Sequence, residues 1–280
     1  MKRTCIAAVL CFGLVLPNIA FADLDPRDYV GAPAGTFAML TYFRHITADT
    51  LYNDGDEVNN NFGLTANVEI FRPVYYFDVG GFLVDIQALL ITGDQEIDAA
   101  GVSSSGIFDP VLLGTVWFIN NGESQTWLGF TPYFSIPVGD YDKDKPLNNG
   151  ENRWKFKEEL MLAKGLGNGW FLDVGGSVEF YTDEDDAKKK QDPLWTGELH
   201  LSKDITKKWY IGASYMYHAG GETEFDGVNS NDSQNNHTLM ATTVFGFDDN
   251  YNLQLQYKRD ISVESGPETS AFQARLLYFF

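Results

Sequence analysis

Apolar and polar side chains alternate along the chain in segments of about ten residues, and the last segment shows the pattern best. From Phe272 to Phe280 the even positions are apolar, whereas Gln273 and Arg275 occupy odd positions. The segment from Tyr251 to Lys258 repeats this alternation. Successive side chains of a strand point to opposite faces, so each segment has one face suited to lipid and one suited to water.

About twelve such segments can be placed, and bacterial single-chain barrels have an even number of strands. Glycine, asparagine and aspartate separate the segments, as expected of turns between strands. The centres of the predicted strands are Leu40, Val68, Ile86, Val116, Thr131, Leu160, Val178, Leu199, Ala213, Thr242, Leu255 and Leu276.

The connections between the segments alternate between short and long. Short turns are predicted at 78–81, 120–122, 165–169, 204–208 and 248–250, and long polar loops at 49–61, 93–105, 139–152, 182–192, 220–235 and 263–268. Outer-membrane barrels have short periplasmic turns and longer external loops. The sequence therefore predicts an all-β fold, a transmembrane antiparallel β-barrel of about twelve strands with periplasmic N- and C-termini.

The main alternative is a soluble secreted β-sandwich, whose strands also alternate. Aromatic residues make up 15% of the chain, and many lie at segment ends. Aromatic girdles at the two membrane interfaces account for that excess. A spanning helix is excluded, because the longest apolar run after residue 22, at 111–119, falls far short of the roughly 20 residues required.

The first 22 residues have the form of a secretory signal peptide. Lys2 and Arg3 precede an apolar run, and Ala20 and Ala22 supply the small residues of a cleavage site. We expect residues 23–280 to form the barrel. Cleavage would remove both cysteines, Cys5 and Cys11, which excludes disulfides and thiolate sites.

Charge narrows the range of partners. Loss of Lys2 and Arg3 from the 20 basic residues changes the net charge from −19 to −21. So acidic a surface repels a phosphate backbone, which argues against a nucleic-acid partner.

The polar faces of the predicted strands indicate which residues line the lumen. A barrel of twelve strands is wider than an eight-strand barrel, whose interior is filled by side chains, and narrower than an open porin. We therefore predict a narrow, partly occluded lumen. The residues on these polar faces form either a polar constriction that selects permeants or a network that pairs buried charges. The two interpretations can coexist. These residues are Asp85, Gln87, Lys155, Lys157, Glu159, Asp173, Glu179, Glu198, His200, Lys258, Gln273 and Arg275. Tyr133 and Trp127 would add aromatic contact area.

Glu158 is an exception, because its position places an acid on the apparent lipid face. We predict a β-bulge between Phe156 and Leu160 that shifts the alternation; a lateral opening of the wall is the alternative.

The sequence contains partial patterns of two further chemistries, a calcium loop and a hydrolytic site. The loop 140–151 has oxygen donors at the spacing of a calcium loop, namely Asp140, Asp142, Asp144 and Glu151, but lacks the central glycine. Glu198 and His200 share one strand face, yet no serine lies in a Gly-x-Ser-x-Gly context. We therefore expect no metal, no cofactor and no enzymatic activity, with an outer-membrane hydrolase as the weaker alternative.

Several motifs resemble one outer-membrane family. They are Pro-Val-Gly-Asp-Tyr-Asp-Lys-Asp at 137–144, Asn-Asn-Gly-Glu-Asn-Arg-Trp-Lys-Phe-Lys at 148–157, and shorter matches at 33–36, 180–186, 191–194, 200–202, 220–221 and 226–228. These motifs and their order along the chain resemble those of the outer-membrane family labelled for the meta-pathway of phenol degradation. Glu158 departs from that family's pattern, which often has proline there.

The resemblance implies an outer-membrane channel of a Gram-negative bacterium for passive uptake of small hydrophobic or aromatic compounds. The expected partners are membrane lipid, lipopolysaccharide, the permeant and the outer-membrane assembly machinery, whose C-terminal signal Phe280 resembles. A structural or partner-binding barrel without transport is the alternative.

Overall fold

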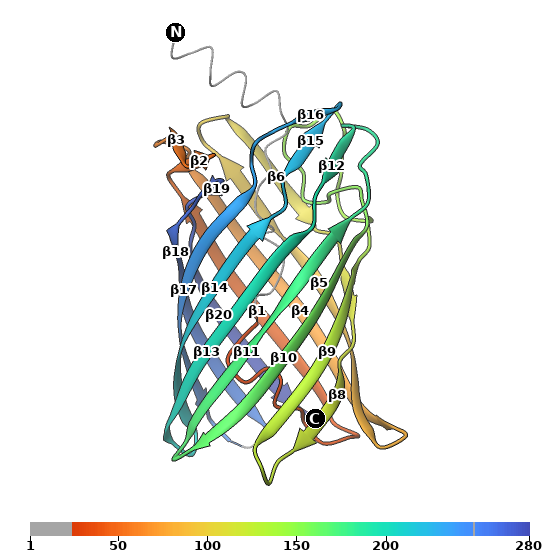
Figure 1. Ribbon diagram of the computed structural model, residues 1–280, viewed down its shortest axis with the longest axis vertical. Helices are drawn as coiled ribbons and strands as arrows, with labels where there is room; N and C mark the ends of the chain where they lie inside the picture. The colour runs from red at the N-terminus through yellow and green to blue at the C-terminus, as the bar shows by residue number, and fades with distance from the viewer. Residues whose placement is uncertain (1–23, 249) are drawn as a thin grey trace.

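The protein is a closed antiparallel β-barrel of twelve strand positions, as predicted (Figure 1). The computed structural model describes residues 24–248 and 250–280, so the expected signal peptide at 1–22 lies outside the described residues. The barrel closes because β1 (Phe37–Ala48) pairs with both β4 (Leu64–Val79) and β20 (Ser270–Phe279). Within the described residues, no helix is long and apolar enough to cross a membrane.

The other barrel strands follow in chain order around the wall. Two short strands, β7 and β8, share one position between β5 and β9. The remaining strands of the wall are β5 (Phe82–Ile97), β7 (Val111–Leu113), β8 (Val116–Asn121), β9 (Thr126–Ser135), β10 (Lys155–Gly167), β11 (Trp170–Tyr181), β13 (Leu194–Thr206), β14 (Trp209–Gly220), β17 (Gln234–Gly246) and β18 (Tyr251–Ser262).

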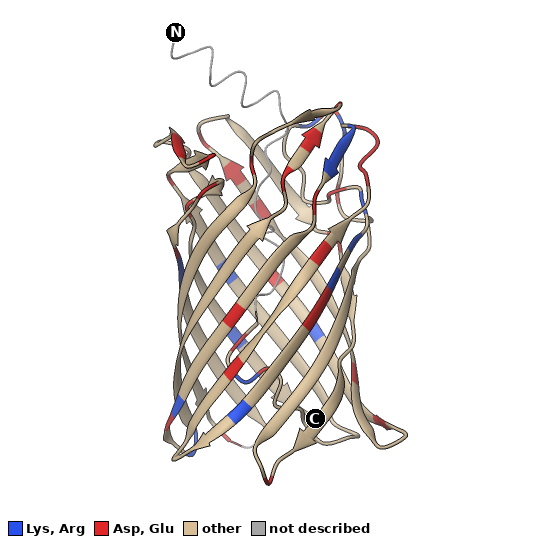
Figure 2. Cartoon of the chain, in the orientation of Figure 1, with Lys and Arg blue, Asp and Glu red and all other residues tan. Residues whose placement is uncertain are grey.

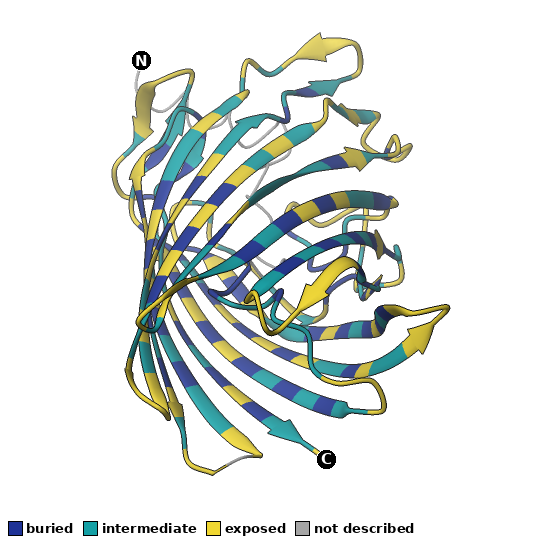
Figure 3. Cartoon of the chain, turned by 60° about the horizontal axis from the view of Figure 1, so that its bottom comes forward, coloured by how far each residue is buried: buried dark blue, intermediate teal, exposed yellow. Residues whose placement is uncertain are grey.

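Burial alternates along the strands, as Figure 3 shows. Every strand position exposes at least one large apolar side chain, which is what a lipid-facing surface requires. Examples around the barrel are Phe43, Phe71, Leu90, Leu112, Phe134, Leu160, Val174, Leu199, Ile211, Leu239, Tyr257 and Leu276. Exposed aromatic rings lie near both ends of the strands, among them Tyr75, Trp170, Trp209 and Tyr251 at one end and Phe134, Trp154, Trp195 and Phe272 at the other.

The short turns gather at the end of the barrel that carries the C-terminus (Figure 1). Asn168 and Gly169 join β10 to β11 with positive φ at both residues, the conformation of a tight hairpin that favours Asn-Gly. Outer-membrane barrels place such turns in the periplasm.

Among the described residues, the opposite end carries the longer connections and seven small strands. The predicted long loop at 93–105 is wrong, because β5 continues to Ile97 and pairs with β6, leaving only residues 98–101 as the turn. The small strands are β2 (Leu51–Asn53), β3 (Asp56–Asn59), β6 (Val102–Ile107), β12 (Lys189–Gln191), β15 (Thr223–Phe225), β16 (Val228–Asn229) and β19 (Gly266–Pro267).

The predicted bulge beside Glu158 is also wrong. Pairing of β10 with β9 and β11 runs without a register shift from Lys155 to Lys164, and the shift in β10 lies between Gly165 and Gly167. Glu158 is exposed on the outer face, between Pro132 and Val178 of the neighbouring strands. It lies three residues from the start of β10 at the loop end, near an interface, where a lipid-facing charge costs little.

This position predicts a small stability gain from Glu158→Leu. The substitution removes a lipid-facing acid, so the free energy of unfolding in lipid vesicles should rise by on the order of 1 kcal/mol. Urea titration followed by tryptophan fluorescence measures it. Leu160→Glu, two residues further from the loop end, is the matched control and should destabilise by a larger amount. If Leu160→Glu lowered the free energy of unfolding only as much as Glu158→Leu raised it, the placement of Glu158 near the interface would be contradicted.

Candidate functional site

Residues 24–36 run inside the barrel before β1 begins, which the alternation did not predict (Figure 1). Leu24, Asp25 and Tyr29 are buried, with 5%, 3% and 5% of their surface exposed. Their partners lie on β8, β9, β10 and β20. We refer to residues 24–36 as the N-terminal segment.

Acidic residues of the N-terminal segment bind the last strand. Arg275 Nη1 donates to Asp25 Oδ2 at 2.6 Å and to Asp28 Oδ1 at 3.2 Å. Gln256 Nε2 donates to the other oxygen of Asp25 at 2.6 Å. A buried guanidinium is costly without a partner, so Arg275 and these carboxylates hold each other inside the barrel.

Arg27 binds a different part of the wall, formed by β11 and β13, which β14, β17 and β18 separate from β20. Its Nη1 donates to Asp204 at 2.7 Å and its Nε donates to Ser202 Oγ at 2.8 Å. Its backbone N–H donates to Asp173 Oδ2 at 3.1 Å. The guanidinium carbon also lies 4.1 Å from the ring centroid of Phe171, an aromatic contact typical of arginine.

Glu159 links the N-terminal segment to β9 and β10. Its Oε1 accepts hydrogen bonds from the hydroxyls of Tyr29 at 3.0 Å and Tyr133 at 2.8 Å. Its Oε2 pairs with Lys157 Nζ at 2.9 Å. Trp117 holds the segment from β8, because its Nε1 donates to the carbonyl oxygen of Tyr29 at 2.9 Å.

The predicted lumen residues all occupy the interior face, as their position in the alternating pattern requires. Ten of them are buried, and Lys157 and Lys258 are half-buried. Acidic and basic positions are interspersed in the barrel wall (Figure 2). The buried ones are Asp85, Gln87, Lys155, Glu159, Asp173, Glu179, Glu198, His200, Gln273 and Arg275.

Most of these side chains bind one another or unpredicted neighbours. Arg72 Nε donates to Gln87 Oε1 at 2.6 Å, and Gln87 Nε2 donates to Asp85 Oδ2 at 2.8 Å. Arg44 donates twice to Gln273 Oε1, at 2.9 and 2.7 Å. The interior charges and amides therefore form a network that satisfies buried polar groups.

His200 contacts both a serine and a carboxylate. Its Nδ1 lies 2.8 Å from Ser214 Oγ, and its Nε2 lies 3.3 Å from Glu198 Oε2. A hydrolytic site needs these groups beside space for a substrate. All three are at least 94% buried, and none lines the cavity described below, so we interpret this group as structural.

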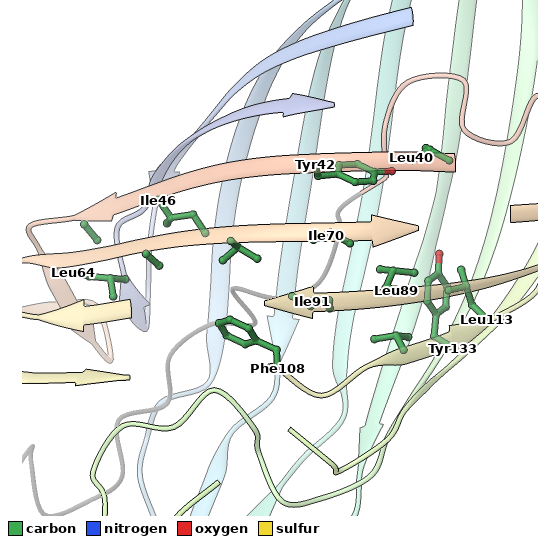
Figure 4. Packing of buried hydrophobic residues seen from close by; sticks show 14 of the residues in the cluster. Leu40, Tyr42, Ile46, Leu64, Ile70, Leu89, Ile91, Phe108, Leu113 and Tyr133 are labelled. Atoms are coloured by element: carbon green, nitrogen blue, oxygen red, sulfur yellow. The ribbon is translucent and has the colours of Figure 1, made fainter. Parts of the chain in front are cut away.

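One side of the interior is apolar, which the prediction of a polar lumen missed. Apolar side chains of β1, β4 and β5 point to the same side of the sheet (Figure 4). They run from Leu51, Phe62 and Leu147 in the external loops, through Ile46, Val68 and Ile91, to Val74 and Leu277 near the short turns. We refer to this stripe as the apolar wall.

A cavity of about 190 Å³ lies between the N-terminal segment and the end of the apolar wall nearest the short turns. Leu40, Val74, Tyr76, Leu113 and Trp117 contribute its apolar lining. Asp28, Arg72, Asp85 and Arg275 add polar groups. The cavity therefore joins apolar surface to groups that can form hydrogen bonds.

The calcium candidate in the external loop does not fit a metal site. The Glu151 carboxylate is bound by Arg153 at 2.8 Å and Lys155 at 2.7 Å. Asp140 Oδ2 accepts the N–H of Ile107 at 2.8 Å, and Asp142 Oδ1 accepts that of Asp144 at 3.0 Å. The described residues hold no group of three or more His, Cys, Asp or Glu placed for a metal ion.

Comparison with known proteins agrees with this architecture. A family model described as "Putative MetA-pathway of phenol degradation" matches residues 47–276. An outer membrane channel from Pseudomonas putida F1, known from a crystal structure, is 30% identical with a TM-score of 0.89, over 92% of this chain and 100% of that chain. No curated protein matches the chain.

Two autotransporter barrels share the fold alone. The translocator domain of NalP from Neisseria meningitidis has a TM-score of 0.55 at 7% identity, over 90% of this chain and 91% of that chain. The beta domain of the Bordetella autotransporter BrkA has a TM-score of 0.54 at 13% identity, over 89% of this chain and 100% of that chain.

The contacts of Arg275 predict that Arg275→Ala loosens the N-terminal segment. The substitution leaves Asp25 buried without its cation, which costs about 3–5 kcal/mol when a buried pair is broken. We expect the ion conductance of single barrels in planar bilayers to rise several-fold. Arg259→Ala is the matched control, because Arg259 is exposed and its pair with Glu268 spans 3.8 Å. Equal conductance of both variants and the unmodified protein would contradict an occluding role.

Proposed function

The chain belongs to this phenol-degradation family, and we propose that its barrel is a passive channel for small hydrophobic or aromatic compounds. The barrel lies in the outer membrane of a Gram-negative bacterium. The relative from Pseudomonas putida is described as an outer membrane channel. No reaction is required, because the permeant would move down its own gradient.

The apolar wall is the observation that carries this proposal. It extends from the external loops to the cavity beside the N-terminal segment, and Figure 4 shows part of its packing. An apolar cavity of 150 Å³ in another protein holds benzene, so the cavity of about 190 Å³ has room for a single aromatic ring. Tyr133 belongs to this apolar cluster and also lines the cavity. Trp127 is buried in the adjoining cluster.

The polar side of the interior supports selection against ions. Lys157 and Glu159 neutralise each other, as do Arg275 and Asp25. Polar groups already bound within a network offer an ion little to replace its hydration shell. We infer that the predicted lumen residues limit ion flow while the apolar wall accepts apolar solutes.

The outer surface suits the partners expected from the sequence. The exposed apolar belt would contact membrane lipid, and the acidic external loops could bind lipopolysaccharide through bridging cations. Phe280 lies at the end of the last strand, where its ring packs 5.1 Å from Phe37. We propose that it serves as the assembly signal.

Ile91→Asn tests the route. Placing an amide in the apolar wall should lower the flux of toluene and phenol into proteoliposomes by on the order of tenfold, since a buried amide without partners costs about 1–3 kcal/mol. Flux is followed by an enzyme trapped inside the vesicles that oxidises the aromatic compound.

Met240→Asn is the matched control. Met240 is buried on β17, outside the apolar wall, and its substitution should change the flux less than twofold. If the unmodified protein gave no aromatic flux above empty vesicles, the channel proposal would fail and a structural or partner-binding barrel would remain. If both variants lost flux equally, the assigned route would be wrong.

A further inference from the structure

Three basic side chains converge at the external end of the barrel, in a chain with a net charge of −19. They come from separate elements: Arg153 precedes β10, Lys155 begins it, and Lys189 begins β12. Figure 2 shows β12 as a basic strand at the end opposite the C-terminus. We refer to these three side chains as the outer basic cluster. None of them belongs to the apolar wall.

Two members of the cluster, Arg153 and Lys155, bind the carboxylate of Glu151. Arg153 donates to Glu151 Oε2 through Nε at 3.1 Å and Nη2 at 2.8 Å, and Lys155 Nζ lies 2.7 Å from Oε1. These cations hold the pKa of Glu151 well below its usual range, so it stays ionised. Its two oxygens are thus engaged by Arg153 and Lys155.

Arg153 keeps one nitrogen unused. Its Nη2 also donates to Gln191 Oε1 at 2.6 Å, whereas Nη1 is buried and has no hydrogen-bond partner among the described residues. The side chain is 2% exposed. A buried guanidinium N–H without an acceptor is costly, and an added anion would relieve that cost.

Lys189 lies on the same short strand as Gln191, the partner of Arg153, and is half-buried, so part of the residue is exposed at the external end. In the described part of the chain, no carboxylate lies within ion-pair distance of its ammonium group. Burial and the positive charges of Arg153 and Lys155 outweigh the attraction of Glu151 and Asp232 and lower the pKa of Lys189 to about 8. Lys189 is therefore still mostly protonated, and so positively charged, at neutral pH.

Aromatic faces flank these cations. The ring centroid of Tyr181 lies 4.5 Å from the guanidinium carbon of Arg153, and that of Phe225 lies 6.0 Å from Lys189 Nζ. Tyr181 ends β11 and Phe225 ends β15. A ligand with a planar ring and a carboxylate could contact both kinds of group.

We propose that the outer basic cluster, with Tyr181 and Phe225, is an extracellular binding site for small aromatic carboxylates. The carboxylate accepts from Lys189 Nζ and, after a small shift of side chains, from Arg153 Nη1. The ring lies against the aromatic faces. Such a site would concentrate aromatic acids at the mouth of a barrel whose net charge otherwise repels anions. It does not depend on passage through the barrel.

Benzoate binding to the purified full barrel in detergent, measured by calorimetry, tests this site. Lys189→Gln should weaken binding by about tenfold, the loss of one charge-assisted hydrogen bond. Lys190→Gln is the matched control, because the neighbouring Lys190 is exposed and pairs with Glu224 at 3.8 Å. It should leave the affinity within about twofold.

The pH dependence separates a ligand contact from a structural role. An anion binds the protonated lysine, so the affinity of the unmodified protein should fall as the pH rises through about 8. Lys189→Arg stays charged at all these values and should bind benzoate without that fall. Glu151 remains ionised throughout and contributes no change.

Two comparison ligands define the class. Acetate supplies the carboxylate without a ring, and benzyl alcohol supplies the ring without the charge; both should bind at least about tenfold more weakly than benzoate. The proposal is overturned if benzoate shows no saturable binding, if Lys190→Gln weakens it as much as Lys189→Gln, or if acetate binds equally well. Because toluene flux does not involve this site, a failed channel test would leave it unaffected.

Discussion

Closure of the hydrogen-bond ladder is the constraint on which the rest of this structure depends. In lipid no water can satisfy a strand edge, so β1 must pair with β20 as well as with β4. Once the ladder is closed, every strand has one face toward lipid and one toward the interior. The outer face must be apolar, and most remaining polar groups are placed inside or at the ends.

The interior therefore has to neutralise charge without much water. The wall alone does not do this, because Arg275 is buried and its charged partners, Asp25 and Asp28, come from the N-terminal segment. Arg27 supplies the reciprocal contact, a cation that meets Asp204 of the wall. The segment thus lies inside the barrel and supplies charges that the wall lacks, so its position and the charges of the wall depend on each other.

The strands were predictable because each lipid-facing position constrains the sequence locally. All twelve predicted centres lie in barrel strands, and the polar side of the interior followed from the same alternation. The apolar wall was not predictable in this way: β5 is apolar on both faces, with Leu90 outside and Ile91 inside, so alternation disappears there. Arg44, on the same face as Tyr42, was a usable sign that this face of β1 points inward.

The N-terminal segment could not be predicted for a different reason. It lacks alternation, and its contacts join residues far apart in the chain, such as Asp25 and Arg275. Such pairs form only once the barrel has brought the strands together. The same holds for the outer basic cluster, in which Lys189 adjoins Arg153 through loop packing. The sequence thus encodes the membrane-facing surface locally, and it encodes the chemistry of the interior and the mouth through long-range pairs. A route for apolar solutes can therefore exist beside a charged network, because the two occupy different parts of the inner surface of one closed barrel.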